Sequence, residues 1–314
     1  MSRLDQIRKW YLRKTLPKSL RHMNRLHPDF RLEPAGTGDD PHYGIYWKDK
    51  PVGQTNPLTA LKKPRSRQCF IIATGPSLAT IDTGKLAGLC CFGVNGAIAL
   101  AKDRGLEFQY HLVSDGSFVR DRLPLVRDMI ESGAECLFSF AALGMLCEHD
   151  RDLLASPNLY LLPEMNYRYQ VPQLSPEAFR RWALRQDGIS LHPDPQYNSG
   201  RVGFSRDINA GVFTAQTVVF EALQVAYYLN FSQVFLLGMD LNAAPGQARF
   251  YERGDNVVKS RLDRDYAPYI LPAFEVARDL VVAEDFAIYN LSPDSRLPDS
   301  VIPKISLQQA LGMN

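Results

Sequence analysis

The segment Gln68–Leu78 constrains the fold of this chain more than any other. It begins with Cys69–Ala73, a continuous apolar run, and then changes to Gly75, Pro76 and Ser77. An apolar run without alternation is typical of a parallel strand that helices cover on both faces. Gly75 allows the backbone to come close to a ligand. Pro76 and Ser77 suit the start of a helix whose free N–H groups can bind a phosphate. We therefore predict the first strand and turn of a nucleotide-binding α/β domain; a turn that binds nothing is the alternative.

Short apolar runs alternate with helical patterns along most of the remaining chain. Further strands are predicted at Cys90–Val94, Phe108–Val113, Cys136–Ser139, Leu159–Leu162, Val234–Leu237 and Ala287–Asn290. The predicted helices are Ala97–Arg104, Leu123–Ser132, Pro176–Gln186, Val212–Asn230, Tyr269–Ala283 and Ser306–Leu311. Strands that alternate with helices form a parallel sheet with right-handed crossovers. The expected fold class is α/β, with a Rossmann-like, mostly parallel sheet and helices on both faces.

The chain divides in sequence into an extension and a main domain. At 314 residues it can form one large α/β domain or two smaller ones. We assign residues 1–66 to a basic N-terminal extension and connector, with residues 27–67 irregular or a short hairpin, and residues 67–314 to the α/β domain. Residues from about 148 to 206 are rich in proline and aromatic residues, and we expect an insertion that forms an acceptor-binding lid. A structural loop over the sheet edge is the alternative.

The first 31 residues are basic and amphipathic. Their positive charges, against only Asp5 and Asp29, are Arg3, Arg8, Lys9, Arg13, Lys14, Lys18, Arg21, Arg25 and Arg31. Apolar residues, including Trp10 and Tyr11, recur at helical spacing, and Pro17 should divide the helix. Such a segment can lie on an anionic membrane surface, gaining about 1 kcal/mol per basic residue near the surface. A helix packed on the main domain, with a solvated basic face, is the alternative.

Charge, cysteine content and hydropathy exclude several classes of protein. The net charge of +2 does not imply a nucleic-acid partner. The five cysteines lie mostly in apolar runs without a CxxC motif, which indicates reduced core thiols of a cytosolic-facing protein. No apolar run reaches 18 residues and the N-terminus lacks the apolar region of a signal peptide. We therefore expect neither a membrane span nor secretion by that route.

Four of the predicted strands end in small or polar residues. These ends are Thr74-Gly75-Pro76-Ser77, Asn95-Gly96, Asp115-Gly116-Ser117 and Gly238-Met239-Asp240. Ligands of doubly wound sheets bind at the carboxyl ends of the strands, so the four ends together predict a binding site. Asn95 suits a nucleobase or ribose, whereas Asp115 and Asp240 can accept from hydroxyls or act as a base. Each aspartate could instead cap the following helix.

Several known motifs are absent from the sequence. There is no GxGxxG and no GxxxxGK[ST], which disfavours NAD enzymes and P-loop NTPases. The His, Cys, Asp and Glu residues show no metal-ligand spacing, so we predict no metal site. A metal-independent site needs donors for a leaving phosphate, and Arg249 and Tyr251 lie in a basic stretch that offers them. A solvated loop is the alternative for that stretch.

These residues, in this order, resemble a known group of proteins. Ile71–Leu78, Asn95, Asn209-Ala210-Gly211 at an expected helix start, and Leu236–Asp240 are similar to the bacterial sialyltransferases that use CMP-N-acetylneuraminate. The chain more closely resembles the lipopolysaccharide-core transferases that add a third residue of 3-deoxy-D-manno-octulosonic acid (Kdo), over about residues 68–311. The segments that match this second family are Val94–Gly96, Ser114-Asp115, Phe118, Arg120–Arg122, Gly203–Ile208, Gln224–Tyr227, Gly238–Leu241, Arg249–Tyr251, Asn290–Arg296 and Ile302-Pro303.

The resemblance implies roles for the residues at the strand ends. Thr74, Gly75, Pro76, Ser77 and Asn95 would face the cytidine nucleotide, and Gly238, Met239 and Asp240 would lie near the cytosine or ribose. Asp115 would lie near the sugar or ribose, Asn209, Ala210 and Gly211 near the donor carboxylate, and Tyr251 would stabilise the leaving phosphate.

The sequence departs from the sialyltransferases at two places. They have Asn where Thr74 stands, and their catalytic His lies in a loop that here spans Ser260–Tyr266 and contains no His. Asp115 and Asp265 are therefore the candidate bases.

The resemblance implies an inverting, metal-independent glycosyltransferase with a sialyltransferase-like, GT-A-type variant of the fold. It would move Kdo, or a related ulosonic acid, from its CMP conjugate to a lipopolysaccharide inner-core sugar, and would need no cofactor. The enzyme would be cytoplasmic and peripheral on the inner membrane, with residues 1–31 on the membrane surface. Two alternatives stay open. The Gly-Pro-Ser-Leu turn resembles that of pterin diphosphokinases, which use ATP and Mg²⁺, and a non-catalytic glycan- or motility-associated accessory protein could have the same fold.

Overall fold

The computed structural model describes residues 3–24, 26–35, 41–61, 66–242 and 261–313. The chain forms two compact units, each built from several segments. Unit 1 contains Met1–Lys62, His111–Ser175 and Ile208–Gly211, and unit 2 contains Lys63–Tyr110, Pro176–Asp207 and Val212–Asn314. This grouping follows contacts in space and so differs from a division of the chain into consecutive stretches.

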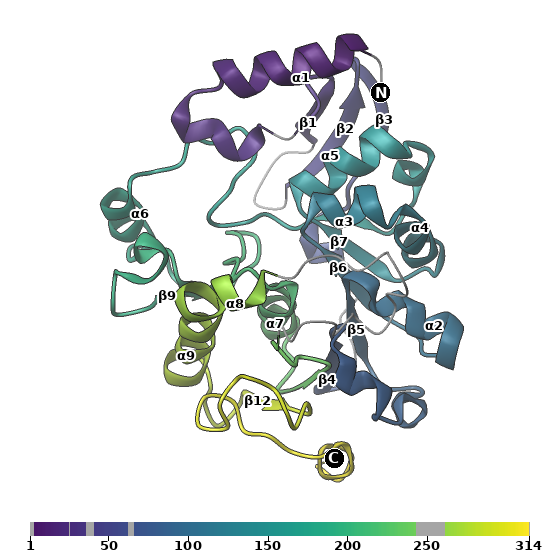
Figure 1. The fold of residues 1–314 in the computed structure, drawn as a ribbon, viewed down its shortest axis with the longest axis vertical. Coiled ribbons are helices and arrows are strands. Elements are labelled where there is room, and N and C mark those ends of the chain that lie inside the picture. Colours follow the sequence, from purple (N-terminus) through teal and green to yellow (C-terminus); the bar gives the residue numbers. More distant parts are fainter. Residues whose placement is uncertain (1–2, 25, 36–40, 62–65, 243–260, 314) are drawn as a thin grey trace. The chain divides into compact units, whose positions relative to one another are not determined.

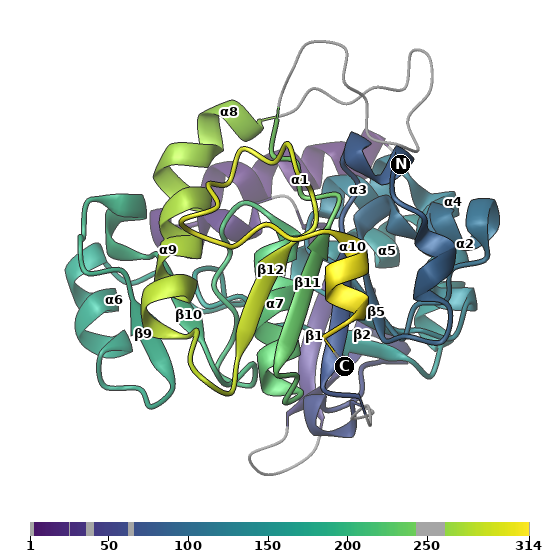
Figure 2. The same ribbon diagram turned by 90° about the horizontal axis from the view of Figure 1, so that it is seen from below.

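Unit 2 is organised around four adjacent strands in the order β12-β11-β4-β5 (Figure 2). Their bounds are Ala287–Asn290 for β12, Gln233–Leu237 for β11, Gln68–Ile72 for β4 and Cys91–Val94 for β5. All three neighbouring pairs are parallel. Phe70, Phe235 and Tyr289 stack across β4, β11 and β12, with ring centroids 4.9 and 5.6 Å apart. The parallel sheet and the Rossmann-like α/β class predicted from the apolar runs are confirmed.

Helices and short turns complete unit 2. The α-helices are α2 Ala99–Arg104, α6 Pro176–Ala183, α7 Val218–Tyr228, α8 Leu262–Asp265, α9 Leu271–Leu280 and α10 Leu307–Leu311. Short 3₁₀ turns are η3 Pro76–Ala79, η4 Thr83–Leu86, η5 Asn95–Ile98 and η7 Tyr197–Gly200, and a π turn, η9, spans Tyr266–Ile270. Helix α7 packs on β4, β5 and β11, which explains why almost all of its side chains are buried.

The predicted helix Val212–Asn230 begins later than expected, and the predicted helix Tyr269–Ala283 begins within a π-helical turn. Helix α7 starts at Val218, because Gln216 has a φ of +57° and Thr217 is extended, and neither conformation continues a helix. Helix α9 starts at Leu271 with Pro272 in its first turn, where the missing N–H of proline is tolerated. The residues before it form the π turn η9.

The predicted insertion is only partly outside the sheet. In unit 2 it supplies α6 and an antiparallel pair, β9 Ile189–Leu191 with β10 Gly203–Ser205. In unit 1, however, β8 Leu159–Leu161 is a parallel partner of β7 Glu135–Phe138. The predicted strand at Leu159–Leu162 thus belongs to the sheet, and the excursion from the sheet begins after β8 rather than near residue 148.

Unit 1 contains three neighbouring strands, β6-β7-β8, of which β6 spans Tyr110–Val113. Helices α4 and α5 pack on β7. The α-helices of this unit are α1 Arg3–Thr15, α3 Gly116–Asp121, α4 Leu123–Glu131 and α5 Phe140–His149 (Figure 1). Its 3₁₀ turns are η1 Lys18–Met23, η2 Leu58–Ala60 and η6 Asp152–Ala155.

The connector of unit 1 is more regular than predicted. Strands β1 Phe30–Ala35, β2 His42–Trp47 and β3 Lys50–Gln54 form an antiparallel sheet in that order. The β2–β3 turn has Lys48 and Asp49 at φ values of +52° and +60°, as in a two-residue hairpin turn of the type that usually contains Asn-Gly. The Lys-Asp pair lacks that sequence signal, which explains why a third strand was missed.

The N-terminal helix α1 ends at Thr15, two residues before Pro17, as the sequence predicts. Ile7, Trp10 and Tyr11 are 56, 60 and 63% exposed, although their spacing places them on one helix face. Arg8 forms an ion pair with Asp29 at 2.6 Å. Within the described residues, no helix is both long and apolar enough to cross a bilayer.

All five cysteines are buried and free, as expected for core thiols. Burial raises the pKa of Cys90, Cys91 and Cys147 to about 12, and it raises the pKa of Cys69 and Cys136 as well. Because the thiolate is the reactive form, we expect the native protein at pH 8 to react negligibly with a thiol-specific disulfide reagent. In 6 M guanidinium, all five thiols of the same protein should react with the reagent. Rapid stoichiometric reaction of the native protein would contradict this burial.

Candidate functional site

The carboxyl ends of β4 and β11 are joined directly in unit 2. The Gly75 N–H donates to the Gly238 carbonyl oxygen at 2.9 Å. Gly238 has a φ of +65°, which favours glycine. A Cβ built on Gly75 would lie 2.8 Å from Cγ of Asp240 and also against the Gly238 carbonyl oxygen. Gly75 is therefore required by close packing of the chain on itself, rather than by the close approach of a ligand that the sequence suggested.

Asp240 is the central side chain of this arrangement. It is only 5% exposed, and its Oδ2 accepts the Ser77 N–H at 2.8 Å. The N–H group that we expected to remain free for a phosphate is thus bound by a carboxylate of the chain itself. Among the described residues, Oδ1 of Asp240 is buried without a hydrogen-bond partner. A buried carboxylate oxygen of this kind can accept a ligand hydroxyl, as ribose or a sugar would supply.

Two serines that follow β12 join the same arrangement. Ser292 Oγ accepts from the Met239 N–H at 3.0 Å and from the Ser77 hydroxyl at 3.2 Å. Ser295 Oγ donates to the Met239 carbonyl oxygen at 2.6 Å. We call the set Gly75, Ser77, Gly238, Met239, Asp240, Ser292 and Ser295 the strand-end cluster. Both serines lie in the segment Asn290–Arg296, which resembles the transferase family but has no role assigned from the sequence. An apolar strand followed by Ser292 and Ser295 nevertheless repeats the signal of the other strand ends.

Arg296 connects the strand-end cluster to helix α8. Its N–H donates to the Asp240 carbonyl oxygen at 2.8 Å, and its guanidinium lies 4.0 Å from the ring centroid of Tyr266. The same guanidinium contacts Asp263 at 2.8 Å. The candidate base Asp265 is buried in this helix and accepts both Nε–H and Nη2–H of Arg264, at 2.7 and 3.0 Å. Asp265 is therefore held in an ion pair.

The other nucleotide-facing residues predicted in unit 2 follow β4 and β5. Thr74 and Pro76 are half-buried. Asn95 directly follows β5, is half-buried, and has a φ of +49°, a conformation that Asn tolerates better than most residues. Arg249 and Tyr251, the predicted phosphate donors, lie outside the described residues.

Unit 1 holds the remaining predicted site residues. Asp115 is exposed and caps α3, accepting the Ser117 N–H at 2.8 Å and the Ser117 hydroxyl at 2.7 Å, as the capping alternative predicts. Asn209, Ala210 and Gly211 do not begin a helix, because α7 starts seven residues beyond Gly211. Gly211 has a φ of +111°, and a Cβ there would lie 3.1 Å from the Met165 nitrogen.

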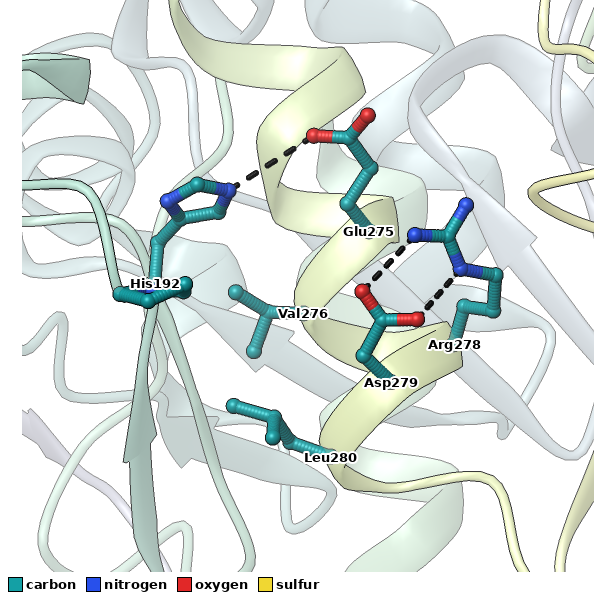
Figure 3. Close-up of a pocket in the computed structure, with 7 residues that line it drawn as sticks. His192, Glu275, Val276, Arg278, Asp279 and Leu280 are labelled. Atoms are coloured by element: carbon teal, nitrogen blue, oxygen red, sulfur yellow. Dashed lines mark hydrogen bonds and ion pairs between the residues drawn. The ribbon is translucent and has the colours of Figure 1, made fainter.

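A separate pocket of about 280 Å³ lies in unit 2 between the β9–β10 pair and α9 (Figure 3). His192 Nε2 is 3.6 Å from Glu275 Oε2 across this pocket, and Arg278 pairs with Asp279. The end of α9 leads into the start of β12, so this pocket is away from the carboxyl ends of the strands. None of the predicted site residues lines it, and we assign the chemistry to the strand-end cluster. In the part of the chain that is described, no group of three or more His, Cys, Asp and Glu residues is placed to hold a metal ion.

Comparisons with known proteins agree on one family. The sequence pattern of the family described as 3-deoxy-D-manno-octulosonic acid transferase WaaZ matches residues 53–308. A protein of Salmonella typhimurium strain LT2, called a probable 3-deoxy-manno-octulosonic acid transferase, is 34% identical over 255 residues, which are 80% of this chain and 91% of the relative. A protein of Escherichia coli K12 with the same description is 40% identical over 115 residues, 36% of this chain and 39% of the relative. The chain thus spans well under half of the E. coli relative.

Among solved structures, the MAf glycosyltransferase from Magnetospirillum magneticum AMB-1 is similar, with a TM-score of 0.42 and 16% identity, over 79% of this chain and 35% of that one. The family match, in contrast, covers most of the chain and includes every residue of the strand-end cluster. The chain therefore belongs to the 3-deoxy-D-manno-octulosonic acid transferase WaaZ family.

Proposed function

We propose that this chain transfers Kdo from CMP-Kdo to an inner-core sugar of lipopolysaccharide, with inversion and without a metal ion. The observation that carries the proposal is the family match over residues 53–308, which contains the strand-end cluster. The buried Oδ1 of Asp240 and the hydroxyls of Ser77 and Ser292 suit the hydroxyl-rich ribose of a cytidine nucleotide. Thr74, Pro76 and Asn95 border the same strand ends and complete the proposed nucleotide site.

The proposed reaction is a single displacement. The acceptor hydroxyl attacks the anomeric carbon of Kdo, a carboxylate takes the hydroxyl proton, and CMP leaves with the electrons of the broken C–O bond. Of the two candidate bases, we favour Asp115, because it is exposed, whereas Asp265 is buried and its carboxylate is paired with Arg264. Arg249 and Tyr251 are the proposed donors to the departing phosphate.

A transfer assay in the presence of a chelator tests both whether CMP-Kdo is the donor and whether the reaction needs a metal ion. We expect the purified chain to release CMP from CMP-Kdo in the presence of an inner-core oligosaccharide, and to add one Kdo to the acceptor by mass spectrometry. Excess EDTA should leave the rate unchanged, since side chains supply the donors for the phosphate. Loss of activity that a divalent ion restores would contradict metal independence.

Calorimetry with CMP, and with ATP plus Mg²⁺, separates the transferase from the kinase alternative, and binding of neither favours the accessory protein.

We also propose that the N-terminal helix contacts the cytoplasmic surface of the inner membrane. Exposed Ile7, Trp10 and Tyr11 on a basic helix support this proposal, because aromatic side chains and positive charge both favour an anionic lipid surface. Deletion of residues 1–31 is a poor test, since Phe30 and Arg31 belong to β1.

The double variant W10S/Y11S is the sharper test of membrane contact. We expect its binding to phosphatidylglycerol vesicles to fall at least about tenfold, because two aromatic rings no longer leave water. CMP binding should be unchanged. Leu184→Ser, which changes an exposed apolar residue directly after α6, is the matched control and should bind vesicles as the unchanged chain does. Equal losses of vesicle and CMP binding in the double variant would count against the proposal.

A further inference from the structure

Arg296 is an exposed arginine whose backbone is attached to the strand-end cluster of unit 2. It directly follows Ser295 of the cluster, and its N–H donates to the Asp240 carbonyl oxygen at 2.8 Å. The Arg296 side chain, in contrast, is 37% exposed. The backbone of this residue is therefore fixed beside the buried carboxylate of the cluster, while its guanidinium is accessible to solvent.

Tyr266 holds Arg296 by its backbone and by its side chain. The Tyr266 hydroxyl donates to the Arg296 carbonyl oxygen at 2.9 Å, and the guanidinium lies 4.0 Å from the ring centroid of the same tyrosine. The face of an aromatic ring attracts a guanidinium and lets it stack. The protein itself thus orients the planar fork of Arg296, which reduces the entropy that a ligand must offset on binding.

Asp263 uses only part of the hydrogen-bonding capacity of Arg296. Asp263 Oδ1 lies 2.8 Å from Arg296 Nη1, whereas no hydrogen bond of Nε or Nη2 joins this arginine to another described residue. Arginine presents five donors, in a fork that matches a carboxylate or a phosphate. Asp263 is 71% exposed, and ion pairs between exposed groups contribute little to stability. Another anion can therefore replace the Asp263 carboxylate at small cost.

The neighbouring Asp240 supplies a second, independent indication of a ligand. Its side chain is 5% exposed, and its Oδ1 is buried without a hydrogen-bond partner among the described residues. A hydroxyl group can donate to this oxygen, and the Arg296 guanidinium can donate to a phosphate. A backbone hydrogen bond joins the two residues, so a small molecule that carries both hydroxyls and a phosphate, such as a nucleoside monophosphate, suits the pair.

We propose that Arg296 binds the phosphate of the cytidine nucleotide and releases Asp263 in exchange. The proposal rests on the proposed function and adds a described residue to the phosphate donors Arg249 and Tyr251. Asp263 then competes with the phosphate for one guanidinium and weakens the binding of CMP. The competition favours turnover, because Asp263 recovers its partner as the product CMP leaves, and product release limits the rate of many enzymes.

The test uses the variants Arg296→Met, Arg296→Lys, Asp263→Asn and the double variant Arg296→Met with Asp263→Asn. Arg278→Met and Asp279→Asn are the matched controls, because Arg278 is also 37% exposed and pairs with an exposed aspartate of unit 2. Three probes are titrated by calorimetry: cytidine, CMP and inorganic phosphate. Inorganic phosphate is included because the same fork of donors also suits a free phosphate ion.

We expect the unchanged chain to bind CMP at least about tenfold more tightly than cytidine. Arg296→Met should reduce this preference at least about fivefold and Arg296→Lys should keep part of it, with cytidine binding within about twofold in both. Asp263→Asn should instead strengthen CMP binding about two- to fivefold, the range that release of an exposed ion pair allows. This gain should vanish in the double variant, because no guanidinium remains to compete for.

Inorganic phosphate should bind the unchanged chain at least about tenfold more weakly than CMP, because it carries no ribose hydroxyl for Asp240. Both control variants should bind all three probes as the unchanged chain does.

Four outcomes would overturn the assignment. Equal losses of CMP and cytidine binding in Arg296→Met would make Arg296 structural, and inorganic phosphate that binds as tightly as CMP would indicate a site for free phosphate. The other two are an unchanged chain that binds CMP no better than cytidine, and a gain from Asp263→Asn that persists in the double variant. Thermal melting checks folding, and Arg296→Lys and Asp263→Asn provide the comparison if Arg296→Met unfolds.

Failure of the transferase proposal would appear separately, since the titrations need no turnover. A chain with the expected binding preferences that transfers no Kdo from CMP-Kdo would retain the role of Arg296 and refute the transferase. Transfer of Kdo, together with an unaltered preference for CMP over cytidine in Arg296→Met, would refute only the role of Arg296.

Discussion

Replacing Gly75 by alanine is expected to lower the free energy of unfolding by about 3 kcal/mol. The added Cβ would lie 2.8 Å from Cγ of Asp240, whose buried carboxylate is held by the Ser77 N–H, and against the backbone carbonyl oxygen of Gly238. The β4 and β11 ends would have to separate, which would also break the Gly75–Gly238 and Ser77–Asp240 hydrogen bonds. Chemical denaturation followed by circular dichroism measures the effect, with the transition midpoint as the readout.

Gly312→Ala is the matched control for this substitution. Gly312 has a φ of −87°, and the nearest heavy atom to an added Cβ is 3.5 Å away, so the change should stay within about 0.5 kcal/mol. If Gly75→Ala were as stable as Gly312→Ala, the packing of the two strand ends described above would be incorrect.

Asp240→Ala is expected to reduce kcat/KM for CMP-Kdo by about 100-fold. Removal of the carboxylate leaves the Ser77 N–H without its acceptor and deletes the buried Oδ1 proposed for the ribose, and hydrogen bonds to charged groups contribute about 1.5–3 kcal/mol each. Asp240→Asn should lose less, because its amide oxygen can still accept from Ser77. Steady-state kinetics with CMP-Kdo and calorimetry with CMP measure both effects.

The control for Asp240 is Asp294→Ala, which removes an exposed carboxylate between the two cluster serines and should alter kcat/KM less than twofold. Thermal melting distinguishes lost binding from lost folding. Full activity in a folded Asp240→Ala protein would rule out the proposed role of the cluster in nucleotide binding.

The sheet could be predicted from the sequence because its strands are short, continuous apolar runs. The β4 and β11 strands are buried along almost their whole length, and their continuous apolar sequences were therefore sufficient to predict them. The β2–β3 hairpin was not recognised as part of a three-stranded sheet, because its turn uses Lys48 and Asp49 at positive φ, where the common signal is Asn-Gly. The start of α7 was predicted too early because Gln216 adopts a left-handed conformation that local residue preferences do not predict.

The candidate site was predictable in position but not in internal detail. The polar strand ends identified Gly75, Ser77 and Asp240, but no sequence rule reveals that the Asp240 carboxylate occupies the Ser77 N–H or that its bulk requires a glycine at position 75. Asp115 illustrates the same limit, since a carboxylate after a strand suits catalysis and helix capping equally well.

The pairing of β4 with β11 has a consequence for how the chain folds during synthesis. Gln68 and Gln233, which face each other across this pair, are 165 residues apart. At roughly 5–20 residues per second, β11 leaves the ribosome on the order of ten seconds or more after β4. During that interval one edge of Cys69–Ile72, a run that ends up completely buried, has no partner strand. The nascent chain therefore presents an apolar, unpaired strand edge to other chains, so slow, dilute expression favours soluble protein.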